Sequence, residues 1–257
     1  MEAFIMNKMN PNGNILIFTP TLGLPQDPAT YQSSLLKVIN QIQARQMGLA
    51  YFPTYRQLWH AANNMAWNTA FEHKFEYILR IDDDIHDIPD DAFGKLLDAD
   101  KDVIGAAYPN RRWPYFTAAM NRTNEKSLIE IWLTSDKTLQ YVSPSPEDPE
   151  GVVPCELVGF GMTLIKTAPF KYLQRPLYLG NEDCPDDTFL AQICLDNGIK
   201  QFVHFGVKIA HAHVNYYNNN ALYTAGIFEQ ANKKEVEFKL TDEEQAMVNA
   251  QKQEVKA

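Results

Sequence analysis

The sequence predicts an α/β fold in which helices flank one mostly parallel central sheet. Between residues 14 and 108, short apolar runs with the composition of buried strands alternate with segments of helical period. Such alternation is typical of parallel sheets that carry helices on both faces. The length of 257 residues suits one domain, or one domain with an appendage. The 45% apolar and 21% charged content is that of a globular protein and excludes disorder over most of the chain.

The elements of the first half follow from the spacing of apolar residues. The predicted strands are short apolar runs at residues 14–18, 49–53, 75–81 and 102–108. The predicted helices between them have apolar residues at three- and four-residue intervals and cover residues 30–47, 56–72 and 89–97. Gly48 ends the first of these helices. The third opens at Pro89 and carries Asp90 and Asp91 in its first turn, where the helix dipole favours acidic side chains.

The second half of the chain is organised less regularly. Its predicted strands are separated by polar turns and cover residues 116–120, 127–133, 139–142, 152–161 and 207–210. Helices are expected over residues 163–173 and 184–197, and Gly198 stops the second. We expect a flexible polar leader over residues 1–13, one folded domain over 14–217 and a helical extension over 218–257. A capping-box pattern at Thr241 opens the last helix of that extension.

The cysteine content and the lack of long apolar runs bear on the cellular compartment. The three cysteines are odd in number, and no pair has C-x-x-C spacing. This excludes a disulfide framework and favours reduced thiols in a cytosolic protein. The N-terminal residues do not resemble a signal peptide, and no apolar run approaches the ~20 residues that a membrane-spanning helix needs. We therefore expect a cytoplasmic protein without membrane attachment.

The net charge is negative and concentrated in one segment. Lys and Arg total 23 and Asp and Glu total 32, which gives −9. Residues 82–102 hold nine Asp and two Lys, a local charge of −7, so the rest of the chain carries only −2. The sign argues against a general nucleic-acid binder, whose affinity comes from neutralising phosphates. The concentrated segment instead marks an edge of the sheet that attracts cations.

Three consecutive aspartates follow the predicted strand at 75–81. If the chain is still extended there, Asp82 and Asp84 lie on one side and Asp83 on the other. Ligands of open α/β sheets bind outside the carboxyl ends of the strands. Two carboxylates in that crevice repel each other unless a cation such as Mg²⁺ or Mn²⁺ neutralises them. The alternative interpretation is an acidic loop whose aspartates cap the helix that follows.

The run from Ile78 to Ile85 resembles the D-x-D motif of GT-A-type glycosyltransferases. Four other segments are similar to that family in order and spacing: Ile17 to Pro20, Ala62 with Asn63, Val103 to Pro109, and Val158 to Ile165. The stretch from Glu182 to Gly198 resembles the one that carries the catalytic carboxylate of inverting members. The resemblance covers residues 14–215 and includes compact bacterial and bacteriophage proteins. It implies a single GT-A-like Rossmann-type domain, with nucleotide-sugar binding in 14–110 and acceptor binding in 111–217.

The resemblance also implies a divalent cation, Mn²⁺ or Mg²⁺, and assigns residues to it. Asp82 and Asp84 would hold the ion, with His211 or His213 completing its shell. A histidine at a strand end is alternatively structural, and the sequence does not choose between the two histidines.

The donor and acceptor residues follow from the same resemblance. Donor-binding residues would be Thr19, Pro20, Asn63 and Asp83. The Arg that relatives carry beside the Asn is Ala62 here, so phosphate contacts are expected from Arg56, His60 or Arg111 instead. Acceptor-binding residues would be Gly159, Phe160, Gly161 and Trp113. Trp113 belongs to a basic-aromatic cluster whose alternative interpretation is a surface loop with a packed Trp.

A carboxylate is needed to accept the proton of the acceptor hydroxyl, and two are candidates. Asp187 has the spacing before Gly198 that the family leads us to expect, and Asp186 has a matching spacing before Phe189. A carboxylate in a partly desolvated cleft can have a raised pKa and act as a base. An Asp before a helix is also a common N-cap, so either residue can have either role.

Three functions remain open on this sequence. The first is a metal-dependent glycosyltransferase that moves a sugar from a nucleotide-diphosphate sugar, a UDP-sugar for preference, to a hydroxyl of a glycan, a protein or a modified DNA base. The second is a sugar-phosphate nucleotidyltransferase, although no Gly-rich phosphate loop follows the first strand. The third is a non-catalytic nucleotide-sugar-binding module. If the chain is encoded by a phage, we expect it in the host cytoplasm.

Overall fold

The computed structural model describes residues 13–21, 28–55, 57–109, 117–134, 138–174, 177–178 and 184–211. The chain divides into two units, Met1–Ala221 and Leu222–Ala257, and all described residues belong to the first. The leader predicted over residues 1–13, apart from Gly13, and the extension predicted over 218–257 lie outside the described residues. Among the described helices, none is long and apolar enough to cross a membrane.

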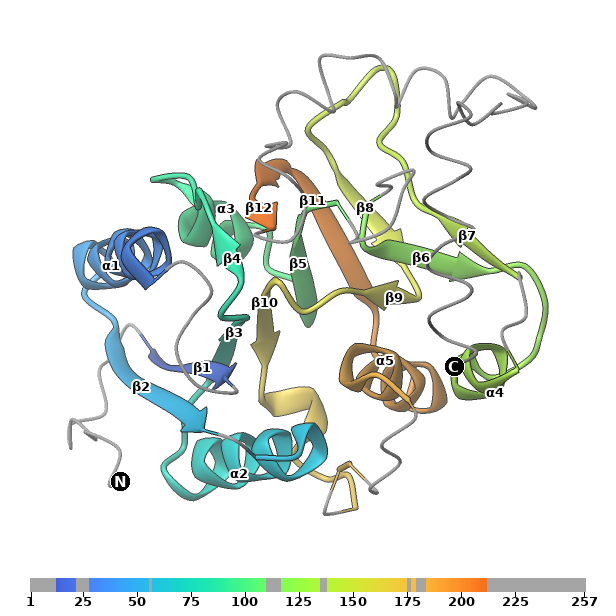
Figure 1. Cartoon of the computed structure of the whole chain (residues 1–257), viewed down its shortest axis with the longest axis horizontal. Coiled ribbons are helices and arrows are strands. Elements are labelled where there is room, and N and C mark those ends of the chain that lie inside the picture. Colours follow the sequence, from blue (N-terminus) through green and yellow to red (C-terminus); the bar gives the residue numbers. More distant parts are fainter. Residues whose placement is uncertain are drawn as a thin grey trace, which may run out of the picture. The chain divides into compact units, whose positions relative to one another are not determined.

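A seven-stranded sheet forms the centre of the first unit (Figure 1). Its strand order is β2-β1-β3-β10-β5-β11-β8. The five mutually parallel strands are β1 (Asn14–Thr21), β2 (Gly48–Tyr55), β3 (Tyr77–Ile81), β5 (Val103–Ala107) and β11 (Gln201–Lys208). The two antiparallel strands are β10 (Met162–Lys166) and β8 (Val152–Cys155). The predicted α/β class with a mostly parallel central sheet is confirmed.

Five α-helices accompany this sheet in the described part of the chain. They are α1 (Pro28–Ala44), α2 (Trp59–Glu72), α3 (Ala92–Asp98), α4 (Leu128–Leu133) and α5 (Asp186–Asp196). A short 3₁₀-helix covers Ala168–Phe170. Figure 1 shows α1 and α3 on one side of the strands and α2 and α5 on the other. Each face of the sheet is therefore covered by helices, as a predominantly parallel sheet requires.

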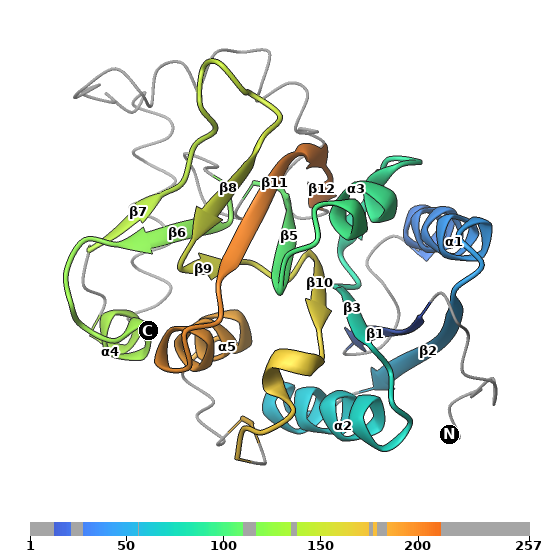
Figure 2. The same ribbon diagram turned by 180° about the vertical axis from the view of Figure 1, so that it is seen from behind.

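Two small sheets extend the central one. The first pairs β4 (Ile85–His86) with β12 (Ala210–His211). The second has the order β7-β6-β9. Its strands are β7 (Leu139–Tyr141), β6 (Ala119–Arg122) and β9 (Leu157–Val158). Seen from behind, this second sheet lies beside β8 and β11 (Figure 2). The β12–β4 pairing returns the end of the described chain to the aspartates that follow β3.

Successive side chains of β1 and β3 lie on opposite faces of the central sheet. Ile15 and Ile17 of β1, with Leu79 and Ile81 of β3, belong to a core cluster that contains α1 and α3 residues. Because successive side chains of a strand point to opposite faces, Arg80 points to the other face, where α2 and α5 lie. The register places Phe18 and Thr163 beside Arg80 on the two neighbouring strands. A charged side chain thus lies on this face of the sheet between the apolar Phe18 and the polar Thr163.

Several local predictions are wrong. The strand predicted at 127–133 is helix α4, because Ser127 caps it: the Ser127 hydroxyl oxygen accepts a hydrogen bond from the Glu130 N–H at 3.0 Å. The helix predicted at 163–173 is β10 followed by the 3₁₀-helix, because the apolar run inserts between two central strands and is buried on both faces. The strand predicted at 152–161 is split into β8 and β9. Asp90 and Asp91 precede helix α3 instead of forming its first turn.

Candidate active site

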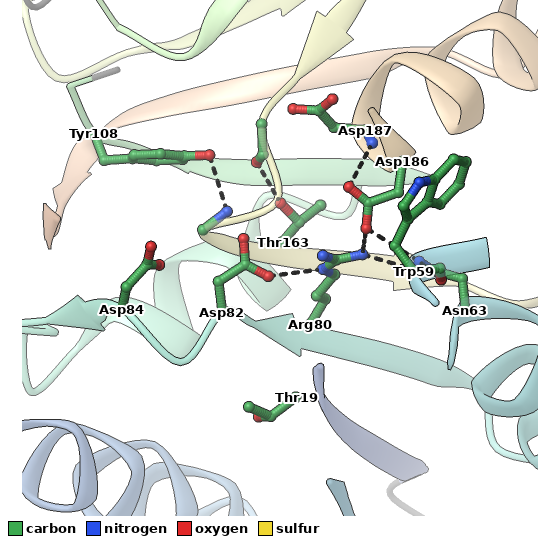
Figure 3. Close-up of polar contacts among 12 residues, drawn as sticks. Thr19, Trp59, Asn63, Arg80, Asp82, Asp84, Tyr108, Thr163, Asp186 and Asp187 are labelled. Carbon is green, nitrogen blue, oxygen red and sulfur yellow. Dashed lines mark hydrogen bonds and ion pairs between the residues drawn. The ribbon is translucent and has the colours of Figure 1, made fainter. Parts of the chain in front are cut away.

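Carboxylates from two distant parts of the sequence meet where β3 ends and α5 begins (Figure 3). Asp82, Asp83 and Asp84 follow β3 directly, and Asp186 and Asp187 are the first two residues of α5. The antiparallel strand β10 brings a third segment to the same place, because its first residue, Met162, pairs with Ile81 at the end of β3. The predicted position at the carboxyl end of a parallel strand is therefore the position observed.

The aspartate segment turns and is not extended. The N–H of Ile85 donates to the carbonyl of Asp82 at 3.2 Å, and the Asp82 N–H donates to the carbonyl of Gly161 at 3.0 Å. The chain is therefore not extended at Asp82–Asp84, since β3 ends at Ile81, and strand alternation does not decide on which side each aspartate lies. Figure 3 nevertheless shows the carboxylates of Asp82 and Asp84 pointing to the same side of the segment. The two side chains that were predicted to act together are thus brought together by a turn.

His211 lies against Asp84. Its Nε2 is 3.1 Å from Asp84 Oδ2, and both side chains are buried. Pairing of His211 with Ile85 in the β12–β4 sheet creates this contact. The ring of His211 also meets the ring of Tyr108 edge-on, with 5.7 Å between centroids. His213, the other histidine predicted as a ligand, lies outside the described residues.

The described residues contain no group of three or more His, Cys, Asp and Glu side chains arranged to hold a metal ion. What they contain is the Asp84–His211 pair and, two residues before Asp84, the Asp82 carboxylate. Burial raises the pKa of Asp82 to about 7; the Arg80 guanidinium opposes this, and the carboxylates of Asp84 and Asp186 add to it. The carboxylates of Asp82, Asp84 and Asp186 thus lie close enough to interact, and burial favours the neutral form of Asp82.

Arg80 links the two groups of carboxylates and was not singled out in the sequence. Its side chain is only 6% exposed. Nε donates to Asp82 Oδ1 at 2.9 Å, and Nη1 forms an ion pair with Asp186 Oδ2. Burial lowers the pKa of Arg80, but the carboxylates of Asp186 and Asp82 outweigh this effect and raise it. The guanidinium is thus a permanent positive charge between the end of β3 and the start of α5.

Asn63 belongs to the same buried network. Its Oδ1 accepts from Arg80 Nη1 at 2.9 Å, while its Nδ2 donates to Asp186 Oδ2 at 3.0 Å and to the Trp59 carbonyl at 2.7 Å. Both ends of the amide are therefore satisfied inside the protein. The structure gives Asn63 a role within the site, and its contact with a donor stays a prediction.

Asp187 differs from Asp186 in its surroundings. Its Oδ1 accepts from the N–H of Thr188 at 2.6 Å and from the Thr188 hydroxyl at 3.3 Å. Burial raises the pKa of Asp187 to about 6, and the neighbouring Asp186 carboxylate adds to the shift. Neither aspartate is the N-cap of α5, which is Pro185. The predicted alternative of an N-cap role is therefore wrong for both residues.

Gly159 and Gly161 allow Tyr108 to approach the segment before β10. The Gly161 N–H donates to the Tyr108 hydroxyl oxygen at 3.0 Å, and an added Cβ on Gly161 would lie 2.8 Å from the Tyr108 ring. An added Cβ on Gly159 would collide with the Tyr108 hydroxyl. Burial, with the charges of Asp82 and Asp187, raises the pKa of Tyr108. The predicted contact of these glycines with an acceptor stays a prediction, and so does that of Phe160, which packs on Arg80.

The predicted donor residues of the first strand, Thr19 and Pro20, lie at the carboxyl end of β1, beside β2. Thr19 is buried, and its Oγ1 is 2.7 Å from the Tyr31 hydroxyl oxygen. Pro20 pairs with Thr54 of β2. Burial raises the pKa of Tyr31, and the nearby Tyr51 and Asp83 add to the shift. The other predicted donor and acceptor residues, Arg56, Arg111 and Trp113, lie outside the described residues.

Comparisons with protein-family models and with curated protein sequences found no match. Among solved structures, the chain is similar to A197 from STIV, with 15% identity, 77% of this chain and 85% of that chain covered, and a TM-score of 0.48. It is also similar to GalNAc-T7, solved with UDP, GalNAc and Mn²⁺. The identity is 9%, the match covers 85% of this chain and 48% of that chain, and the TM-score is 0.48. A third similar structure is a candidate glucose-1-phosphate thymidylyltransferase from Bacillus anthracis. The identity is 10%, the match covers 87% of this chain and 96% of that chain, and the TM-score is 0.46. All three TM-scores lie below 0.5.

Proposed function

We propose that this chain is a metal-dependent glycosyltransferase that moves a sugar from a nucleotide-diphosphate sugar to an acceptor hydroxyl. The observation that carries the proposal is the meeting of two chemically different carboxylate groups. Asp82 and Asp84, with His211, stand at the end of β3, and Asp187 stands at the start of α5. Metal-dependent glycosyl transfer with inversion uses both, because charge develops on the leaving diphosphate while a proton leaves the acceptor.

The donor set at the end of β3 fits a divalent cation. Mg²⁺ and Mn²⁺ take oxygen ligands, and Mg²⁺ sites commonly use one or two carboxylates together with water and substrate phosphates. Asp82 and Asp84 supply two carboxylates. Burial is the main cause of the raised pKa of Asp82, and the Asp84 carboxylate adds to the shift through a repulsion that a cation would relieve. His211 adds an imidazole next to Asp84. A bound ion would stabilise the charge of the departing nucleoside diphosphate as a Lewis acid.

Asp187 is the better candidate for the base. Both oxygens of Asp186 already accept hydrogen bonds, Oδ1 from the Asp187 N–H at 3.1 Å and Oδ2 from Arg80 and Asn63. Asp187 accepts from Thr188, and its pKa of about 6 leaves it ionised at neutral pH yet more basic than an ordinary aspartate. Such a carboxylate can accept the proton of an acceptor hydroxyl. Asp186 in this proposal orients the network and does not take up a proton.

The donor would lie across the carboxyl ends of β1 and β3. Thr19, Pro20 and Asp83 border this region, and crevices at the carboxyl ends of strands are where open α/β sheets bind ligands. We favour a UDP-sugar as donor. The acceptor would approach from the segment Gly159–Gly161 and from Trp113, and a glycan, a protein or a modified DNA base are all compatible with that chemistry.

A sugar-phosphate nucleotidyltransferase is the alternative function. It also uses strand-end carboxylates to bind a metal-bound nucleotide, but its nucleophile is a phosphate that is already ionised at neutral pH. Such a reaction needs no base, whereas a carboxylate with a pKa near 6 in the site is what hydroxyl activation needs. The environment of Asp187 therefore favours glycosyl transfer over nucleotidyl transfer.

The test combines ligand binding with product identification. UDP-, GDP-, CDP- and ADP-sugars are screened by thermal shift with and without Mn²⁺, since a ligand at 100 times its Kd stabilises a protein by about 2.7 kcal/mol. The protein is then incubated with the stabilising donor and Mn²⁺, and the release of nucleoside diphosphate is measured. We expect release by the wild type, none by Asp84→Ala, and unchanged release by Asp98→Ala, whose carboxylate forms a surface ion pair with Arg45. Release of pyrophosphate from a nucleoside triphosphate with a sugar phosphate would favour the alternative.

A further inference from the structure

The guanidinium of Arg80 bridges the metal-side and base-side carboxylates of the candidate site. It contacts Asp82 through Nε at 2.9 Å and forms its ion pair with Asp186 through Nη1 (Figure 3). We propose that Arg80 is a positioning residue that fixes Asp82 relative to helix α5 and makes Asp186 an anchor, so that Asp187 remains as the base. This inference rests on the proposed glycosyl transfer and adds the residue that aligns its two halves.

The chemistry of the bridge requires an arginine. A guanidinium offers several N–H donors in a planar fork, so one side chain meets two carboxylates and the Asn63 amide oxygen at the same time. A lysine ammonium at the same position is a single point charge on a flexible stem. A buried charge is tolerated only when it is paired and hydrogen-bonded, and the pairing of Arg80 satisfies this condition.

Two aromatic rings hold the guanidinium in place. Its carbon lies 4.3 Å from the ring centroid of Phe160 and 5.6 Å from that of Phe18. Phe18 is the partner of Arg80 in the β1–β3 register, and Phe160 lies two residues before β10. The sheet backbone thus limits where the guanidinium can move, and cation–π attraction adds to this restriction. A rigid connector of this kind is what a positioning residue needs.

The anchor on the helix side is equally fixed. Asp186 Oδ2 accepts from Asn63 Nδ2 as well as from Arg80, and Asn63 is itself tied to the Trp59 carbonyl of α2. Asp186 Oδ1 accepts from the backbone N–H of Asp187. The position of the Asp187 backbone therefore depends on Asp186, and through Arg80 it depends on Asp82. Displacing Arg80 would move both ends of the reaction site.

The experiment measures kcat and KM for nucleotide-sugar turnover at saturating Mn²⁺, together with Tm, for a small set of variants. The set is Arg80→Lys, Arg80→Met, Asp186→Asn, the double variant Arg80→Met with Asp186→Asn, and Arg45→Met. Arg45 is the matched control, because it forms a two-point ion pair with Asp98 at 2.8 and 2.7 Å on the surface. The double variant removes a charge together with its counter-charge and so covers the case in which Arg80→Met fails to fold.

We expect kcat to fall about 10–100-fold in Arg80→Met, as is usual when a residue that orients a site ligand is removed. KM for the donor should change less than threefold, because Arg80 does not contact the donor in this proposal. The kcat of Arg80→Lys should fall nearly as far as that of Arg80→Met, since an ammonium cannot span both carboxylates. The double variant should be no slower than Arg80→Met, because both substitutions break the same link. Arg45→Met should match the wild type.

Distinct results overturn the inference. Wild-type kcat in Arg80→Met or Arg80→Lys, an effect confined to KM, or fully additive losses in the double variant each contradict a positioning role. If kcat fell equally in Arg45→Met, the effect would be general destabilisation, and the positioning role of Arg80 would be overturned as well. If the wild type releases no nucleoside diphosphate from any donor, the proposed function itself fails, and the inference that rests on it fails with it.

Discussion

His211 Nε2 lies 3.1 Å from Asp84 Oδ2, although the two residues are 127 positions apart in the sequence. The contact depends on the two-residue strand β12 pairing with β4 immediately after the aspartate turn. The Asp84 side chain is only 3% exposed and that of His211 only 8%. A short, late strand therefore completes the surroundings of an aspartate that the first half of the chain supplies.

The first prediction concerns metal dependence. His211→Ala should raise the Mn²⁺ concentration for half-maximal activity about 10–100-fold, because the imidazole supports or joins the metal shell. Asp84→Asn should lose activity at every Mn²⁺ concentration, since it removes the carboxylate itself. The measurement is nucleoside diphosphate release across a Mn²⁺ titration. Identical titration curves for the wild type and His211→Ala would restrict His211 to a structural role.

The second prediction concerns the pH dependence of turnover. Because Asp187 must be ionised to accept a proton and its pKa is about 6, kcat/KM should fall about tenfold per pH unit below that value and level off above it. Asp187→Asn should remove the activity, whereas Asp186→Asn should retain part of it. The measurement is kcat/KM from pH 4.5 to 8.5 with saturating Mn²⁺. Greater loss in Asp186→Asn than in Asp187→Asn would exchange the roles of the two residues.

Much of the fold followed from the sequence because short apolar runs alternate with segments of helical spacing in its first half, which is typical of an α/β fold. The run ending at Ile81 could be recognised as a strand, and the aspartates after it as lying at a strand end, from local pattern alone. The strand predicted at 127–133 and the helix predicted at 163–173 were wrong, because a short apolar segment suits a helix and a buried strand equally. Tertiary insertion between β3 and β5 decides the second case, and no local pattern records it.

The site residues that the sequence did not reveal depend on long-range contacts. Arg80 stands alone among apolar residues, and that is itself a signal, because a charge inside a strand interior needs a buried partner. Its partners, Asp186 and Asn63, come from α5 and α2, so the sequence indicates that a partner is required and does not identify it. The proposed division of roles between Asp186 and Asp187 rests on the same contacts, since the sequence surroundings of the two residues are nearly identical.

The third prediction concerns the stability cost of the candidate base. A carboxyl whose pKa is raised by folding binds more protons in the native state than in the unfolded chain between about pH 4 and 6. Its contribution to the free energy of unfolding therefore falls as the pH rises through this interval and stays low above it. Asp187→Asn, which cannot ionise, should be more stable than the wild type by about 1 kcal/mol at pH 7.5.

Urea denaturation at pH 7.5 and at pH 4 checks the third prediction. The advantage of Asp187→Asn should shrink at pH 4, where the wild-type carboxyl is also neutral. Asp98→Asn is the matched control, because its exposed carboxylate pairs with Arg45 and should give no such gain. A variant less stable than the wild type at pH 7.5 would mean that the Asp187 carboxylate stabilises the fold.

The fourth prediction concerns the close approach of Gly161 to Tyr108. An added Cβ would lie 2.8 Å from two ring carbons of Tyr108 and 2.9 Å from the Ile85 side chain, well inside ordinary contact distance. Gly161→Ala should therefore lower the free energy of unfolding by about 1–3 kcal/mol, as overpacking of a filled interior does. It should also lower activity, because the Gly161 carbonyl accepts from the Asp82 N–H and a shift would move that aspartate. Urea denaturation and donor turnover are measured on the same samples. The same substitution in a Tyr108→Ala background, where the ring is absent, should cost measurably less, and an equal cost in both backgrounds would place the strain elsewhere than at the ring.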